Sequence, residues 1–152
     1  SHILQMRDNK KFGNAGVQWI EMGVPSFSPY VPFFTNATDT AESYREVPDK
    51  MDLNSSFWLY EALATVVESH YSEFSEENLD YQKNLSEWAR RKIAAVDKEA
   101  ANLSGDALTE YLTKQNQEIA DHYNQETKAL LFKLLTDGAE LSKLTFKMDP
   151  NL

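Results

Sequence analysis

Residues 30–34, Tyr-Val-Pro-Phe-Phe, are the most constraining segment of this 152-residue sequence. Their aromatic and β-branched side chains favour an extended strand. The first and last residues of that strand point to one face while Val31 and Phe33 point to the other, so both faces are apolar and the strand must lie between two layers. Because Pro32 has no backbone N–H to donate, we expect the strand at a sheet edge or at a bulge.

Two more short strands precede this segment. Residues 1–7 form an extended run, and residues 16–22 alternate large apolar side chains with others in the manner of a strand. Residues 8–14 suit a hairpin connection, and residues 23–29 suit a loop punctuated by proline. Three strands cannot cover themselves on both sides, so we expect covering layers from the later helices and from protein outside this chain.

A long polar loop and an apolar helix follow the strands. Residues 36–53 are polar and contain Pro48, which is typical of a connecting loop. Asn54 or Ser55 then offers an N-cap for a helix at residues 57–71. Since that segment is apolar on nearly every side, we expect the helix to be buried.

Two long helices are predicted in the remaining sequence. The second helix extends from about Ser75 to Ala101, and the third begins at Ser104 or Asp106 and stops at Asp137-Gly138. At roughly 1.5 Å per residue the third would be about 45 Å long, so we expect it to pack antiparallel along the second. A strand or an ordered tail would follow it. The expected core positions of the third helix are Leu108, Leu112, Gln115, Ile119, Tyr123, Glu126, Leu130 and Leu134.

The predicted fold class is therefore α+β. Short antiparallel strands and the connecting loop occupy residues 1–53, and three helices, two of them long and antiparallel, occupy residues 54–152. The chain starts at Ser1 without an initiator Met, in what looks like a strand already under way. We therefore expect both parts to be one fragment of a larger catalytic domain, with more of the same polypeptide upstream.

Composition excludes several classes of function. A net charge of −9 argues against nucleic acid and anionic lipid as partners. No apolar run is long enough to span a membrane, and no signal sequence opens the chain. The absence of cysteine excludes disulfides, thiolate metal sites and a cysteine nucleophile within these residues, and it is compatible with the cytoplasm. The sequence gives no reason to expect a cofactor, and it is compatible with a homo-oligomer.

Few residues suggest chemistry by themselves. Glu118, His122 and Glu126 share one helix face, but a single helix offers too few ligands in good geometry, so we predict no metal site. We interpret His70 as a histidine at a helix end whose hydrogen bonds are satisfied, and Ser1 as a chain boundary instead of an N-terminal nucleophile. Without a nucleophile elbow, a phosphate loop or a zinc motif, the chain does not look like a self-contained enzyme.

Four stretches together resemble the later part of the bacterial cysteine dipeptidases, which are N-terminal nucleophile (Ntn) hydrolases. The resemblance covers residues 1–71. The stretches are Ser-His-Ile-Leu-Gln-Met-Arg (1–7), Gln-Trp-Ile-Glu-Met-Gly-Val-Pro (18–25), Ser-Pro-Tyr-Val-Pro-Phe-Phe-Thr-Asn-Ala-Thr-Asp-Thr (28–40) and Asn-Ser-Ser-Phe-Trp-Leu-Tyr (54–60).

The resemblance implies a four-layer αββα core and a thiol peptidase that hydrolyses dipeptides. In that family an N-terminal cysteine attacks the dipeptide carbonyl and its own α-amine moves the proton. Here the cysteine would lie upstream of Ser1, so the isolated chain is expected to be inactive. The candidate catalytic residues are His2 and Arg7, because Arg7 can pair with a carboxylate or an oxyanion. The candidate substrate-binding residues are Gln5, Asn36 and Thr38.

Two other functions stay open on the sequence alone. The long acidic helices suit a non-catalytic interaction module that docks onto a partner. A linear amide acylase of the same nucleophile class would act on non-peptide amides. Recovery of a partner from the folded chain would indicate the first, and a panel of dipeptides and acyl amides would separate the second from a dipeptidase.

Overall fold

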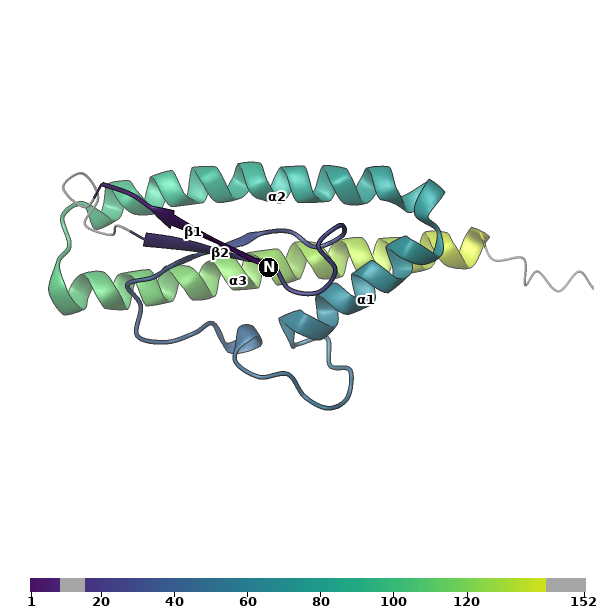
Figure 1. The fold of residues 1–152 in the computed structure, drawn as a ribbon, viewed down its shortest axis with the longest axis horizontal. Coiled ribbons are helices and arrows are strands. Elements are labelled where there is room, and N and C mark those ends of the chain that lie inside the picture. The colour runs from purple at the N-terminus through teal and green to yellow at the C-terminus, as the bar shows by residue number, and fades with distance from the viewer. Residues whose placement is uncertain (9–15, 142–152) are drawn as a thin grey trace, which may run out of the picture.

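A computed structural model gives the fold, and it describes residues 1–8 and 16–141 (Figure 1). The fold is α+β, as predicted, with three antiparallel strands followed by three helices. Within the described residues, none of the helices combines the length and apolar character that crossing a bilayer requires. The elements are β1 (His2–Met6), β2 (Gly16–Ile20), β3 (Val31–Phe34), a short 3-10 helix η1 (Glu42–Tyr44), α1 (Ser56–Ser69), α2 (Tyr71–Ala100) and α3 (Gly105–Leu141).

The strands form one sheet in the order β1-β2-β3, which places β3 at an edge. The Thr35 N–H donates to the Gly16 carbonyl at 3.2 Å, which makes these two residues a hydrogen-bonded pair. Hydrogen-bonded and non-hydrogen-bonded pairs then alternate along the β2–β3 ladder. Pro32 lies opposite Trp19, at a position whose backbone nitrogen points away from β2. Because Pro32 therefore removes no ladder bond, the expected edge position of this strand is confirmed.

Asn116 of α3 closes the free edge of β3. The Phe34 N–H donates to Asn116 Oδ1 at 2.8 Å, and Asn116 Nδ2 donates to the Phe34 carbonyl at 3.0 Å. The side-chain amide thus makes the two bonds that a neighbouring strand would make. Asn116 is buried, so the pair of bonds fixes α3 against the sheet edge without access of solvent.

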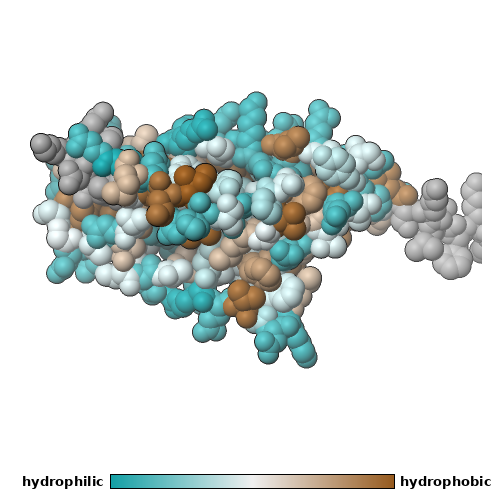
Figure 2. Space-filling model, in the orientation of Figure 1, coloured by the Kyte–Doolittle hydropathy of each residue, from teal (hydrophilic) through white to brown (hydrophobic). Residues whose placement is uncertain are grey.

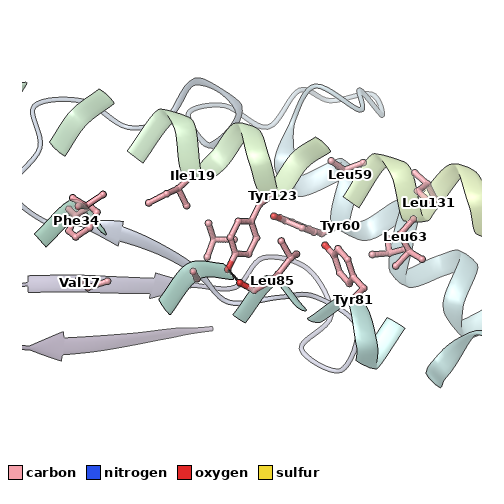
Figure 3. Packing of buried hydrophobic residues seen from close by; sticks show 14 of the residues in the cluster. Val17, Phe34, Leu59, Tyr60, Leu63, Tyr81, Leu85, Ile119, Tyr123 and Leu131 are labelled. Atoms are coloured by element: carbon pink, nitrogen blue, oxygen red, sulfur yellow. Dashed lines mark hydrogen bonds between the residues drawn. The ribbon is translucent and has the colours of Figure 1, made fainter. Parts of the chain in front are cut away.

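One face of the sheet is covered by helices. α2 and α3 run antiparallel, as predicted, and the sheet lies across the end at which they are joined (Figure 1). Val17 and Phe34 share this face and belong to the core cluster, with exposed fractions of 1% and 2%. Figure 3 labels both side chains together with Ile119 and Tyr123 of α3, which belong to the same core cluster.

The core between the three helices is rich in tyrosine. The Tyr123 hydroxyl lies 3.1 Å from the Tyr30 carbonyl and 3.2 Å from the Leu85 carbonyl, so it links the start of β3 to α2. The Tyr81 hydroxyl and Thr127 Oγ1 are 2.6 Å apart. Burial raises the pKa of Tyr81 and Tyr123 well above the usual value for a phenol, so both hydroxyls stay neutral.

The boundary between α1 and α2 differs from the prediction. Ser55 is the N-cap of α1, as expected, but α1 ends at Ser69 and α2 already begins at Tyr71. His70 alone separates them, and its carbonyl accepts the N–H groups of Glu73 and Phe74, each at 3.0 Å. The predicted start at Ser75 was wrong because one residue outside helical dihedral angles is enough to redirect the chain.

Two expectations for α3 were also wrong. The helix continues through Gly138 to Leu141 instead of stopping at Asp137-Gly138, because Gly138 does not adopt the positive φ of a C-cap. A Cβ there would lie 3.7 Å from the Phe74 ring, in ordinary contact. Thr127 is buried and Glu126 is exposed. The other seven predicted core positions are buried. The hairpin connection, beyond Asp8, and the tail after residue 141 lie outside the described residues.

We predict that Asn116→Leu lowers the free energy of unfolding by about 2–4 kcal/mol, because two buried backbone groups of Phe34 lose their partners. Asn84→Leu on the exposed surface of α2 is the matched control and should change it by less than about 0.5 kcal/mol. Urea unfolding monitored by circular dichroism measures both. Equal midpoints for the two variants would contradict the bridging role of Asn116.

Candidate functional site

The second face of the sheet, here called the open face, is not covered by α2 or α3. In β1, Leu4 and Met6 are 63% and 82% exposed on it, although both are apolar. Figure 2, drawn in the orientation of Figure 1, shows hydrophobic side chains gathered where β1 and β2 lie. The open face is formed by His2, Leu4, Met6, Gln18, Ile20, Val31 and Phe33, which the strand register places on the same side. At its β3 end Val31 is buried and Phe33 packs on Tyr44, so the face is most exposed over β1.

A cavity of about 410 Å³ lies at the border between the open face and the loop that follows β3. Ile20 and Phe33 contribute apolar surface to it, and Thr38, Asp39 and Thr40 contribute polar groups. Small-ligand sites are concave and combine apolar surface with a few polar groups that fix the orientation of the ligand. The cavity is therefore the candidate functional site of the described residues.

Tyr44 forms one wall of this cavity. Its ring packs edge-on against Phe33, with centroids 5.0 Å apart, and its hydroxyl lies 3.0 Å from the Tyr60 hydroxyl. Burial raises the pKa of Tyr44 well above the ordinary phenol value. Tyr44 is therefore a neutral hydrogen-bonding group near pH 7, and it cannot serve there as a general base.

The loop after β3 is hydrogen-bonded along one side of α3. Thr109 Oγ1 donates to Asn36 Oδ1 at 3.0 Å. The Thr38 N–H donates to Thr113 Oγ1 at 3.0 Å, and the two threonine hydroxyls are 3.2 Å apart. Asn36 and Thr38, both candidates for substrate binding, thus hold the loop in place, and Thr38 also faces the cavity.

The same side of α3 continues to hold the loop further along. The Glu42 N–H donates to Gln117 Oε1 at 3.0 Å, and Asn124 Nδ2 donates to Ser43 Oγ at 2.8 Å. The α3 residues in these bonds are spaced by about one or two helical turns. This polar stripe was missed from the sequence, where its only signal is a helical period of polar residues. It comprises Thr109, Thr113, Gln117 and Asn124.

A larger hollow of about 980 Å³ lies between residues 42–55 and α3. Its lining is polar and carries both signs of charge, including Arg45, Asp121 and Lys128. None of its lining residues belongs to the sheet. We therefore place the candidate site at the smaller cavity, next to the open face.

Of the three candidate residues in and just after β1, two point toward the helices. The Arg7 guanidinium pairs with Asp97 of α2 at 2.5 Å, and both side chains are nearly buried, with 9% and 12% exposed. Gln5 Oε1 accepts a bond of 3.1 Å from the Trp19 indole. His2 lies on the open face by the strand register. The structure therefore brings His2 and Thr38 to the open side of the sheet and separates them from Gln5 and Arg7.

Glu118, His122 and Glu126 share one face of α3, and two of them make other contacts in the structure. Lys92 donates to Glu118 at 2.9 Å, and the His122 ring stacks on Trp88 with centroids 3.9 Å apart. Among the residues that the structure describes, no group of three or more potential metal ligands comes together.

Glu21, immediately after β2, was not singled out by any sequence pattern. Its side chain is 3% exposed, and neither carboxylate oxygen has a hydrogen-bond partner among the described residues. A buried carboxylate without a partner destabilises the fold, which makes Glu21 unusual among the acids of this chain.

Comparison with known proteins gives consistent matches. The model of peptidase family C69 matches residues 1–84. The chain is similar to "Probable dipeptidase" of Latilactobacillus sakei, with 59% identity over the whole chain and 32% of the relative. It is also similar to "Dipeptidase A" of Lactobacillus helveticus, with 34% identity over 97% of the chain and 31% of that relative. The chain therefore spans about a third of the length of these curated relatives.

The matched regions include the candidate site. The family model covers the sheet, the loop after β3, α1 and the first part of α2. The relatives extend the similarity through α3, which the stretches noted in the sequence did not reach. The polar stripe of α3 thus lies in the part of the chain that only the relatives match.

We predict that breaking the Arg7–Asp97 pair is costly. Arg7→Met or Asp97→Asn should lower the free energy of unfolding by about 3–5 kcal/mol, because each leaves a nearly buried charge without its partner. The exposed Arg45–Asp39 pair is the matched control, with 51% and 58% of the side chains exposed. Arg45→Met should change stability by less than about 1 kcal/mol. Similar losses for Arg7→Met and Arg45→Met in chemical denaturation would refute the structural role of Arg7.

Proposed function

The chain belongs to peptidase family C69, and from that premise we propose that it is the C-terminal part of a dipeptidase. The observation that supports this most directly is the similarity to relatives named dipeptidases, of which the chain spans about a third. The proposed reaction is hydrolysis of a dipeptide by a cysteine nucleophile. This chain has no cysteine, so the nucleophile belongs to the upstream part of the same polypeptide.

The proposed architecture is the αββα core of the N-terminal nucleophile hydrolases. In that arrangement a second sheet covers the open face and packs against Leu4, Ile20 and Phe33, while α2 and α3 form the outer layer on the opposite side. Leu4 is exposed and Ile20 and Phe33 are only partly buried, which supports the proposal, because an apolar sheet face is stable only when another layer covers it.

The proposed chemistry has two stages. The cysteine thiolate attacks the dipeptide carbonyl carbon, the peptide C–N bond breaks, and the leaving amine takes a proton that the α-amine of the cysteine carries. Water then adds to the thioester and the C–S bond breaks. The N-terminal amino acid of the dipeptide leaves with a free carboxylate, and the cysteine thiolate is regenerated. No metal or cofactor is needed for either stage.

The contribution of this chain would be to wall and position the substrate. We propose Thr38, at the cavity, and Asn36, in the same loop, as substrate-positioning groups, and His2 as a catalytic candidate on the open face. Gln5 lies on the other face and accepts a bond from Trp19, so we propose that it positions the substrate only indirectly, through the packing of β1 on β2. Arg7 would act as a pair with Asp97, so its influence on the reaction would pass through the packing of β1 on α2. The lack of cysteine agrees with a reducing compartment, and we propose the cytoplasm.

Thiol alkylation tests the proposed function. The full-length gene product is assayed for release of free amino acids from a panel of dipeptides, before and after treatment with iodoacetamide. We expect hydrolysis that alkylation abolishes, with the modified cysteine found by mass spectrometry outside these 152 residues. The 152-residue chain alone is the control, and it should neither hydrolyse dipeptides nor take up the reagent, since it contains no thiol.

Three outcomes would contradict the proposal. Activity that survives complete alkylation would exclude a cysteine nucleophile. Cleavage of acyl amides in preference to dipeptides would indicate an amide acylase. A full-length protein that is inactive on both panels but binds a protein partner through its helices would indicate an interaction module.

A further inference from the structure

The two edges of the sheet are treated differently. At the β3 edge, Pro32 removes one outward N–H and Asn116 bonds both outward groups of Phe34. Natural sheets protect their edges with proline, with charged residues or with covering segments, because an unprotected edge recruits other strands. The β3 edge therefore shows two such devices within four residues.

The β1 edge shows none of these devices. Ser1 and Glu21 exchange both backbone bonds, at 3.0 and 2.9 Å, which fixes the alternation of the β1–β2 ladder. By that alternation the backbone groups of Ile3 and Gln5 point to β2, and those of Leu4 point outward. No described residue covers this edge, and the strand has neither proline nor lysine nor a bulge.

β1 is also exposed on both of its faces. Ile3 is 52% exposed on the side of the helices, and Leu4 and Met6 are exposed on the open face. An edge with unpaired backbone groups and apolar side chains on both sides has the properties of an interior strand of a sheet. Among the described strands, β2 alone pairs with it.

We infer that β1 is an interior strand of a wider sheet, and that a β-strand from the part of the polypeptide outside these 152 residues pairs with its free edge. This inference rests on the proposed function in one respect, since both place the chain within a longer polypeptide. The relatives that match nearly the whole chain are about three times its length, so each has residues outside the matched part from which such a strand can come. The partner strand is apolar on both faces, because it continues layers that are apolar on both sides of β1.

Amide hydrogen exchange of the full-length gene product, resolved by residue, tests the inference. The inward amides of Ile3 and Gln5 are the internal control, because β2 protects them. We expect the outward amide of Leu4 to be protected to within about tenfold of these two. An alternating pattern, with Leu4 exchanging about 100-fold faster than Ile3 and Gln5, would overturn the inference.

Two further readouts identify the partner and separate this inference from the proposed function. Protection of Leu4 that disappears when the protein is diluted to a monomer would mean that a second copy pairs with β1, which also overturns the inference. Dipeptide hydrolysis is measured on the same preparation. If the protein hydrolyses dipeptides but the Leu4 amide is unprotected, the strand pairing is wrong and the proposed function stands. If the Leu4 amide is protected but dipeptides are not hydrolysed, the proposed function is wrong and the strand pairing stands.

Discussion

A sheet that is apolar on both faces is stable only between two layers, and this requirement governs the whole chain. α2 and α3 provide the layer behind Val17 and Phe34, which are almost completely buried. On the open face the described residues cover Val31 at the β3 end, but no comparable layer covers Leu4 and Met6 of β1. Burying a side chain of this size contributes about 1.5–3 kcal/mol, so covering the open face would add substantially to stability.

Polar contacts hold the sheet on its helical layer and fix its orientation. Asn116 bonds the backbone of β3. The Tyr123 hydroxyl lies within hydrogen-bond distance of the Tyr30 carbonyl, just before β3, and of the Leu85 carbonyl in α2. Arg7 joins the end of β1 to Asp97. The polar stripe of α3 then holds the loop beside the cavity. These contacts therefore hold the sheet, the loop after β3 and the candidate cavity in one fixed arrangement in this member of peptidase family C69.

Much of the fold was predictable because it follows from local patterns. The edge position of β3 followed from the missing N–H of Pro32, and the α+β layout followed from the change of hydrophobic period. Helix ends were not predictable at His70 and Gly138, because tertiary packing decides whether a chain turns there. Thr38, proposed for substrate binding from its place after a strand, lines the candidate cavity. The buried Glu21 and the stripe on α3 depend on contacts between distant residues, which a sequence pattern does not contain.

The most direct measurement compares two native methionines by hydrogen peroxide oxidation and peptide mass spectrometry. Met6 on the open face and Met51 in the loop are 82% and 62% exposed in this chain, so both should oxidise at similar rates in the 152-residue protein. In the full-length gene product, oxidation of Met6 should slow by about tenfold or more while that of Met51 is unchanged. Equal oxidation of the two methionines in the full-length protein would show that the open face faces solvent, and it would contradict this account.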